Sequence, residues 1–296
     1  MKSILITGGA GSIGSNLLFR LIHNIKVQNM SSWYYDKIII MDNDEYGLSL
    51  LEEKIGESNP IVKLALGDIR DRHRLRYLLR GVDAVVHCSA YKRVEVAEHN
   101  VSEVIRVNIE GTLNLVEECQ NANIKKILLI SSDKAVPYKD ICTYGITKLM
   151  QERMVLLSNN HTIQCSVVRF GNVIGTKGDV LDIWTRQFLE GKPLSITNKD
   201  MKRYFWSMEE AVNFIIKCLS YMKGGEIFIP KMQEYNIMDY AKMKFGDNVK
   251  FKIIGLRSGE TMKHKLMTEE EQNHVEDLGW CYRIRGKSFE GVKTGI

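Results

Sequence analysis

The sequence lacks the patterns of a membrane protein, a secreted protein or a metalloprotein. No apolar run approaches the ~18 residues of a membrane-spanning helix, and the opening MKSILITGG is too short for the apolar core of a signal peptide. The six cysteines form no C-x-x-C pair, and the seven histidines show no H-x-x-x-H spacing. We therefore expect a cytoplasmic protein with reduced thiols, no membrane association and no metal site.

Long basic runs are also absent. The net charge of +5 is spread along the chain, whereas a surface dedicated to nucleic acid shows clustered Lys and Arg. We therefore expect no nucleic-acid partner, while a positive balance suits an anionic small substrate. A chain of 296 residues is long enough for one large domain, or for a main domain with a smaller lobe.

Only four prolines interrupt the chain, and its first part alternates short apolar runs with amphipathic stretches. Continuous Ile, Val and Leu runs are typical of strands buried on both faces of a parallel sheet. Such runs lie at 4–7, 37–41, 61–66, 83–87, 126–131 and 164–170. Helical patterns lie between them, at 13–25, 72–81 and 101–124. The alternation predicts an α/β fold, a Rossmann-like doubly wound parallel sheet.

The pattern loosens after about residue 172, where the elements become shorter. We therefore predict a dinucleotide-binding domain over residues 1–172 and a smaller substrate-binding lobe formed mostly by residues 173–296. The boundary is soft, because the chain can pass between the two parts more than once.

A glycine-rich turn stands at the start of the alternating series. The glycines of ILITGGAGSIG (4–14) have the spacing G-x-x-G-x-x-G, directly after a predicted strand and before a predicted helix. Glycine permits the tight turn and lets backbone N–H groups approach a pyrophosphate at the positive end of a helix. In this context the motif predicts a bound dinucleotide rather than a purely structural turn. The residues expected to contact it are Gly8, Gly11, Ser12, Ile13 and Gly14.

Acidic residues at the ends of the next two strands favour NAD over NADP. Asp42 ends the second predicted strand, where a carboxylate accepts hydrogen bonds from the adenosine ribose and repels a 2′-phosphate. No Arg or Lys occurs from 42 to 51 to neutralise such a phosphate, although Lys37 leaves NADP open. Asp68 and Ile69 follow the third strand, where Asp68 is placed to contact the adenine.

The stretch SSDKAVPYKDICTYGITK (131–148) follows the fifth predicted strand and carries two groups of reactive side chains. Ser132, Asp133 and Lys134 emerge at the carboxyl edge of the sheet, where doubly wound folds bind ligands. Tyr144 and Lys148 are four residues apart, on one face of a helix.

A tyrosine is a poor base at neutral pH, but a nearby lysine and an oxidised nicotinamide favour its phenolate. We therefore interpret all five side chains as catalytic and expect Tyr144 and Lys148 to contact the cofactor as well. The alternative for Asp133 and Lys134 is an ordinary surface ion pair.

Further motifs extend this pattern almost end to end. They are TGGAGSIG (7–14), GDIRD (67–71), HCSAYKRVEVAEHNVSEVIRVNIEGT (87–112), SSDKAV (131–136), YGITK (144–148), VVRFGNVIGTKGDV (167–180), LSITNKDMKRYFWSMEEAV (194–212) and LRSGETMKHKLMTEEE (256–271). In them the chain resembles the extended short-chain dehydrogenase/reductase superfamily. The Ser-Asp-Lys triplet, M-x-R-x-F-W (201–206) and R-x-G-E (257–260) narrow the resemblance to the inverting UDP-N-acetylglucosamine 4,6-dehydratases of bacterial polysaccharide biosynthesis.

The resemblance implies a reaction on a UDP-linked sugar. Tyr144 takes the proton of the C4 hydroxyl as hydride passes from C4 to NAD(P)+, and Ser132 hydrogen-bonds that oxygen. A neutral Lys134 then removes the C5 proton, a protonated Asp133 protonates the leaving C6 hydroxyl, and hydride returns to C6. The resemblance also implies a homo-oligomer, with helices such as 101–122 and 141–158 at the interface. The substrate-binding residues that it suggests are Lys92, Asn108, Arg169, Asn172, Lys177, Arg203 and Arg257.

The chain departs from this family pattern at three places. The loop between Lys134 and Tyr144 is two residues longer than usual, and Asp182 and Ser258 each stand where proline is usual. These changes leave open the sugar substituent, the nucleotide and the stereochemistry at C5.

Two alternatives to a dehydratase follow from the same residues. One is a nucleotide-sugar 4-epimerase, or another C5-epimerising enzyme, using the same 4-keto chemistry. The adjacent Asp133 and Lys134 argue against simple epimerisation. The other is a non-catalytic dinucleotide-binding regulator, which would have no need of Tyr144 and Lys148.

Overall fold

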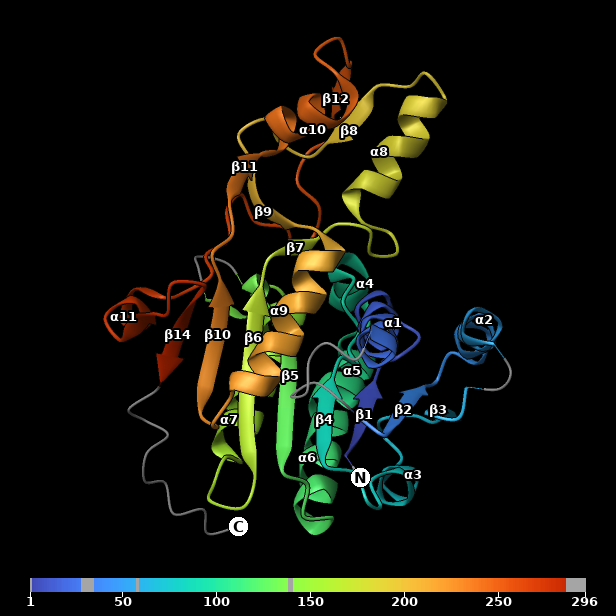
Figure 1. Ribbon diagram of the computed structural model, residues 1–296. Helices are drawn as coiled ribbons and strands as arrows, with labels where there is room; N and C mark the ends of the chain where they lie inside the picture. Colours follow the sequence, from blue (N-terminus) through green and yellow to red (C-terminus); the bar gives the residue numbers. More distant parts are fainter. Residues whose placement is uncertain (1, 28–34, 57–58, 138–140, 286–296) are drawn as a thin grey trace.

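The computed structural model describes residues 2–27, 35–56, 59–137 and 141–285. Its centre is a nine-stranded sheet with the order β13-β14-β10-β6-β5-β4-β1-β2-β3 (Figure 1). The seven strands from β10 to β3 run parallel, whereas β14 pairs antiparallel with β10, and β13 antiparallel with β14. The predicted doubly wound, Rossmann-like α/β fold is confirmed.

The bounds of the elements are as follows. The strands are β1 (Ser3–Thr7), β2 (Lys37–Asp42), β3 (Val62–Leu66), β4 (Ala84–His87), β5 (Lys126–Ser132), β6 (Gln164–Phe170), β7 (Asn172–Val173), β8 (Leu194–Ile196), β9 (Lys202–Trp206), β10 (Glu226–Pro230), β11 (Glu234–Asn236), β12 (Phe251–Ile253), β13 (Val275–Asp277) and β14 (Cys281–Arg285). The α-helices are α1 (Ser12–Val27), α2 (Glu45–Ile55), α3 (Arg72–Leu78), α4 (Val94–His99), α5 (Val101–Val104), α6 (Gly111–Asn121), α7 (Thr143–Leu157), α8 (Val180–Leu189), α9 (Met208–Tyr221), α10 (Ile237–Phe245) and α11 (Glu269–Gln272).

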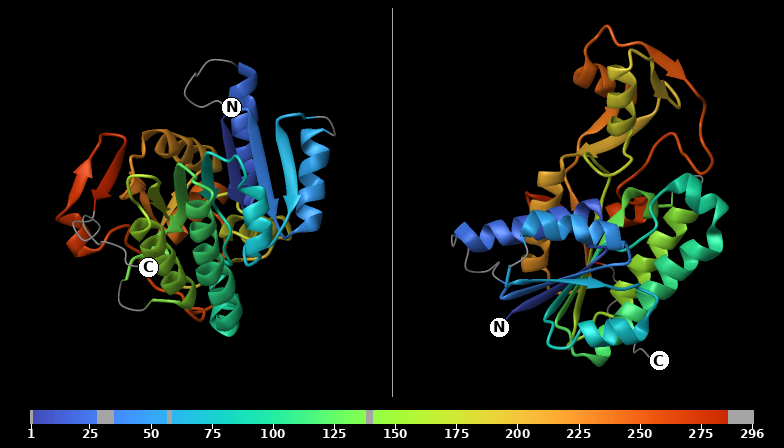
Figure 2. Two further views of the ribbon diagram at one scale, coloured as in Figure 1. Left: turned by 90° about the horizontal axis from the view of Figure 1, so that it is seen from below. Right: turned by 90° about the vertical axis from the view of Figure 1, so that its right-hand side faces the viewer.

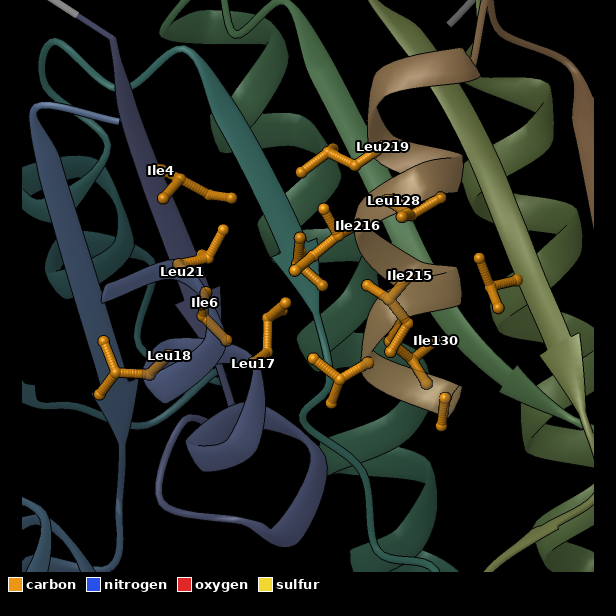
Figure 3. Close-up of a cluster of buried hydrophobic side chains, with 14 of the residues drawn as sticks. Ile4, Ile6, Leu17, Leu18, Leu21, Leu128, Ile130, Ile215, Ile216 and Leu219 are labelled. Atoms are coloured by element: carbon orange, nitrogen blue, oxygen red, sulfur yellow. The ribbon is translucent and has the colours of Figure 1, made fainter. Parts of the chain in front are cut away.

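Helices cover both faces of the main sheet (Figure 2). Because successive strand residues point to opposite faces, Ile4 and Ile6 of β1 pack into a cluster with α1, α2 and α9. Leu5, between them, packs into a second cluster with α3, α6 and α7. Figure 3 shows the first cluster, with Leu17 of α1 and Ile216 of α9 lying over the sheet. Burial on both faces explains why these strands are continuous apolar runs.

A smaller lobe stands beyond the carboxyl edge of the main sheet (Figure 1). It contains the two-stranded sheet β12-β8 with α8 and α10, and its apolar core includes the fully buried Trp184. The Trp184 Nε1–H donates to the Ser195 carbonyl over 2.8 Å. A three-stranded sheet, β11-β9-β7, lies between the lobe and the main sheet. The chain enters the lobe twice. Between the two passages it returns to the main sheet, where it forms α9 and β10.

The helical pattern predicted over 101–124 is not one regular helix. It consists of α5, a π-helical segment at Ile105–Glu110 and α6. The wider π turn interrupts the α-helical ladder, as such turns often do near functional sites. Part of the unusually long loop between Lys134 and Tyr144, residues 138–140, lies outside the described residues.

The described part of the chain contains neither a membrane-spanning helix nor a metal-binding cluster. No helix there is long and apolar enough to cross a membrane. No group of three or more His, Cys, Asp and Glu side chains gathers there in a way that could hold a metal ion. The six cysteines are all free thiols.

Candidate active site

The two halves of the 131–148 stretch pack directly against each other at the end of β5. Residues Asp133–Ala135 form a single 3-10 turn after the strand, and α7 begins at Thr143. A Cβ atom on Gly145 would lie 2.3 Å from the Lys134 carbonyl oxygen, which no side chain could tolerate. Glycine at this position therefore lets the helix that carries Tyr144 and Lys148 approach the triplet.

Asp133 contacts three other polar side chains of the site. The residue is 1% exposed, and its Oδ1 accepts from Ser132 Oγ over 2.9 Å and from Lys134 Nζ over 3.2 Å. Its Oδ2 lies 3.0 Å from His264 Nδ1. Burial raises the pKa of this carboxyl, but the charge of Lys134, the charge that His264 carries when it is protonated, and the hydrogen bonds from His264 and Ser132 bring it well below its usual value. Asp133 is therefore an ionised, fully paired carboxylate in the chain by itself.

Tyr144 lies beside this carboxylate and is 8% exposed. Burial, and then the negative charge of Asp133, raise the pKa of its phenol well above the usual value, while a hydrogen bond with Ser132 lowers it. The phenol is therefore protonated in the chain by itself. Lys148 points its Nζ at the Ile130 carbonyl, 2.6 Å away. Burial lowers the pKa of Lys148 to about 8, against the opposing charge of Glu152.

The glycine turn has the shape that a pyrophosphate requires. Gly8 has a φ of +65°, and a Cβ there would lie 2.7 Å from the Ser89 nitrogen. A Cβ on Gly14 would lie 2.5 Å from the Gly8 carbonyl oxygen. A side chain at either position would clash with neighbouring backbone, so glycine is required for this tight turn at the start of α1, and a turn of this kind lets backbone N–H groups approach a dinucleotide phosphate. Gly11 donates its N–H to the Gly8 carbonyl and closes the turn.

Asp42 braces this turn from the end of β2. Its Oδ2 accepts from the Ala10 N–H over 2.9 Å, and its Oδ1 accepts from the Asp44 N–H over 3.0 Å. Each carboxylate oxygen can accept a second hydrogen bond, so both oxygens remain able to bind ribose hydroxyls.

Asp68 and Ile69 lie further along the same edge. The Arg70 guanidinium holds the Asp68 carboxylate through two hydrogen bonds of 3.0 and 2.7 Å. These hydrogen bonds, and more weakly one from Asn43, lower the pKa of Asp68 despite its partial burial. Ile69 is 5% exposed and packs beneath Gly111, where a Cβ would lie 2.5 Å from its Cγ2. The Ile69 side chain therefore belongs to the core.

The interpretation of Arg169 as a substrate ligand is corrected by its contacts. Its side chain is 2% exposed. Its Nε and Nη2 donate to the Glu152 carboxylate, and both terminal nitrogens donate to Glu271. Nη1 also donates to the Leu266 carbonyl. All five N–H donors of a guanidinium are therefore used inside the protein, and none is left for a phosphate.

Asn108 is likewise committed to internal hydrogen bonds. The side chain is fully buried in the π-helical segment. Its Oδ1 accepts from the Tyr91 N–H, and its Nδ2 donates to the Tyr91 carbonyl and to Thr147 Oγ1. Asn108 therefore fastens the loop that carries the exposed Lys92 to α7, rather than facing a substrate.

Two other predicted ligands lie on the segment that leads from β6 towards the lobe, and one of them contacts the dinucleotide turn. The N–H of Lys177 donates to Ser12 Oγ over 2.9 Å, and the Lys177 side chain is exposed. Asn172, at the start of β7, donates to the Tyr204 carbonyl over 3.1 Å and is half-buried.

The two remaining arginines border the 257–266 segment. Arg203 is 7% exposed and donates to the carbonyls of Thr261 and Met262. Arg257 is exposed, and its Nη1 pairs with Glu95 of α4 over 2.8 Å. Arg257 therefore keeps donors available to a ligand.

His264 is a site residue that the sequence did not indicate. It lies 131 residues after Asp133, in a segment rich in lysine and without a metal-ligand spacing. No local pattern distinguishes such a histidine from a solvated one.

Known proteins resemble this chain in sequence and in fold. A family model described as "Polysaccharide biosynthesis protein" matches residues 4–286. The chain is 37% identical to the UDP-N-acetylglucosamine 4,6-dehydratase (inverting) of Campylobacter jejuni, over 93% of this chain and 79% of that protein. It is 32% identical to the UDP-glucose 4-epimerase of Rickettsia canadensis, over 96% of this chain and 82% of that protein.

A solved structure of DesIV, a dTDP-glucose 4,6-dehydratase from Streptomyces venezuelae with NAD bound, has the same fold. Its TM-score is 0.79 at 20% identity, and the match covers 92% of this chain and 90% of that one.

Replacing the buried guanidinium should destabilise the protein. In Arg169→Met, Glu152 and Glu271 lose their common partner, and we expect the free energy of unfolding to fall by about 3–5 kcal/mol, the usual cost of breaking a buried ion pair. The measurement is urea unfolding followed by circular dichroism. The control is Arg257→Met, which removes an exposed ion pair and should cost under about 1 kcal/mol. Unchanged stability with weakened nucleotide binding would restore Arg169 as a ligand.

Proposed function

The chain belongs to the polysaccharide biosynthesis protein family within the extended short-chain dehydrogenases/reductases, and we propose that it is an NAD-dependent nucleotide-sugar 4,6-dehydratase. The substrate that we propose is UDP-N-acetylglucosamine, with inversion at C5. The observation that carries the proposal is the ion pair between the buried Asp133 and the partly buried Lys134, beside Tyr144. An epimerase needs the tyrosine and the serine, but a dehydratase also needs an acid and a base to remove water.

Asp133 and Lys134 must be a protonated carboxyl and a neutral amine before they can remove water. One internal proton transfer brings them to this working state. A proton that moves from Lys134 Nζ to Asp133 Oδ1, along the 3.2 Å hydrogen bond, leaves a neutral amine and a protonated carboxyl. The amine then takes the C5 proton of the 4-keto sugar. The carboxyl gives its proton to the C6 hydroxyl, which leaves as water, and the ion pair is restored.

Oxidation at C4 is assigned to Tyr144 and Ser132. Tyr144 receives the proton of the C4 hydroxyl, for which it must first become a phenolate, and Ser132 hydrogen-bonds the same oxygen. NAD, when bound, would accept the C4 hydride and later return it to C6. Hydride return to C6 requires a proton at C5, and Tyr144 gives up the proton that it took from the C4 hydroxyl, which restores the phenolate. Delivery from the face opposite Lys134 would invert C5. Lys148, with a pKa of about 8, lies one helical turn from Tyr144, and we propose that it holds the nicotinamide ribose.

The cofactor would lie on the glycine turn. Gly8, Gly11 and Gly14 form its phosphate cradle, with the Ser12 and Ile13 backbone at the positive end of α1. Asp42 would bind the adenosine ribose, which favours NAD over NADP.

The nucleotide would lie between the main sheet and the lobe. We propose Lys92, Asn172, Lys177, Arg203 and Arg257 as its ligands, because they border this region and carry polar or cationic groups suited to phosphate or uridine. We also propose a reducing cytoplasmic setting, which the six free cysteines fit.

A 4-epimerase is the second candidate, because the Rickettsia relative carries that name. One experiment separates the two. Purified protein is incubated with UDP-N-acetylglucosamine, and the product is analysed by mass spectrometry and NMR. We expect a 4-keto, 6-deoxy product lighter by one water. An isomer of unchanged mass would establish the epimerase instead.

Removing the base should separate the two halves of the reaction. In Lys134→Ala we expect release of water to be abolished, while reduction of NAD by the C4 hydroxyl persists, because Tyr144 and Ser132 remain. Absorbance of the reduced nicotinamide reports the first step, and mass spectrometry reports water loss. Lys192→Ala, in an exposed pair on the lobe, is the control and should keep both steps. Full dehydration by Lys134→Ala would refute its assigned role.

Self-association is proposed through α6 and α7, which lie side by side. Their outer faces expose Leu113, Ile146 and Met150, each between 45% and 50%, and exposed aliphatic side chains on adjacent helices are typical of an interface. We expect a homo-oligomer by light scattering, and Ile146→Lys should shift it to smaller species. Leu189→Lys, at a lobe position that is 78% exposed, should leave the oligomer unchanged. A monomeric wild type would contradict this assignment.

A further inference from the structure

His264 approaches the reactive pair from the far end of the chain. Its Nδ1 lies 3.0 Å from Asp133 Oδ2, and the His264 side chain is 11% exposed. The neighbouring residues Lys263 and Lys265 line a cavity of about 520 Å³ that includes none of the reactive side chains. The segment therefore presents its histidine to the active site and its lysines to a separate cavity.

Buried arginines hold the backbone on both sides of His264. Arg203 donates to the carbonyls of Thr261 and Met262, at 2.6 and 3.1 Å. Arg169 donates to the carbonyl of Leu266, at 3.1 Å. Both guanidiniums are less than a tenth exposed. Two buried anchors within three residues on either side leave the imidazole little freedom to move from the carboxylate.

We propose that His264 is a positioning residue that controls the protonation of Asp133, and so sets the lower pH limit of water elimination. This inference rests on the proposed dehydratase function. His264 acts through Asp133 and is not assigned a contact with the sugar.

The effect of His264 on the protonation of Asp133 follows from the charge of the imidazole. A neutral His264 donates its Nδ1–H to Oδ2 and orients the carboxylate, whose Oδ1 stays on Lys134. The working state forms when a Lys134 Nζ–H bond breaks and an Asp133 Oδ1–H bond forms, so that two opposite charges become two neutral groups. A protonated His264 would place a positive charge 3.0 Å from the carboxylate, stabilise its ionised form and oppose that transfer.

The sign of the pH dependence follows from the groups around His264. Burial lowers its pKa most, the Asp133 charge and hydrogen bond raise it, and the charges of Lys134 and Arg203 lower it, so that it lies below its ordinary value of about 6.5. His264 is therefore neutral at pH 7, and elimination proceeds. Elimination should slow as the pH falls through the pKa of His264.

The kinetic test compares two variants of His264 with a control. Asn in His264→Asn can keep a donor near the Nδ1 position but does not titrate, whereas His264→Ala removes the donor. The control is His274→Asn, at an exposed histidine just after α11. For each protein, the rates of C4 oxidation and of water loss from UDP-N-acetylglucosamine are measured separately across pH.

We expect the acidic decline in water loss to disappear in His264→Asn and to persist in His274→Asn. In His264→Ala, water loss should slow about 10- to 100-fold, the effect of losing a hydrogen bond to a charged group, while C4 oxidation changes less than about twofold. An unaltered acidic decline in His264→Asn, or an equal loss of both steps in His264→Ala, would overturn the inference.

A titration of His264 without substrate tests its pairing with Asp133 independently of the proposed dehydratase function. Imidazole NMR of the wild type and of Asp133→Asn reports the pKa of His264 directly. Loss of the carboxylate should lower that pKa, and an unchanged value would show that the pair does not form in solution. A wild type that releases no water would refute the dehydratase function, and with it the control of elimination, even if the titration shows the pair.

Discussion

The guanidinium of Arg169 joins the elements on which the site depends. It links Glu152 of α7, Glu271 of α11 and the carbonyl of Leu266 from its place on β6, and Glu152 also accepts from Ser131 of β5. Charges at this depth are tolerated only when they are paired, so removal of one member leaves the others at a high cost. The network therefore holds the end of β5, the helix that carries the tyrosine and the segment that carries the histidine in one arrangement.

Charge is concentrated in the site in a second, smaller network. Asp133 is buried and ionised among Ser132, Lys134 and His264, and its charge helps to keep the neighbouring Tyr144 phenol protonated. The chain by itself thus rests with its acid deprotonated. Elimination needs a protonated Asp133 and a neutral Lys134, and the shift of a single proton from Lys134 to Asp133 supplies both. A bound cofactor and sugar would meet groups that are already placed within hydrogen-bonding distance of one another.

The fold was predictable because the physical signal is local. Six strands of the main sheet lie within one residue of the predicted runs, since burial on both faces demands continuous apolar residues. The roles of Asn108 and Arg169 were not predictable in this way. The family resemblance suggested ligands, but an amide or guanidinium satisfies its hydrogen bonds inside the protein by the same chemistry that would bind a substrate. Only the packed structure shows which partners they found.

The sequence by itself determined the sheet, the glycine turn and the grouping of Ser132, Asp133, Lys134 and Tyr144, because these depend on residues close together in the chain. The tertiary structure alone decided that His264 would face the acid, at a separation of 131 residues. A local pattern specifies where a backbone runs and which side chains it carries. The partner of a buried charge is chosen when distant segments pack together, because each ion must then find an opposite charge or a donor within reach.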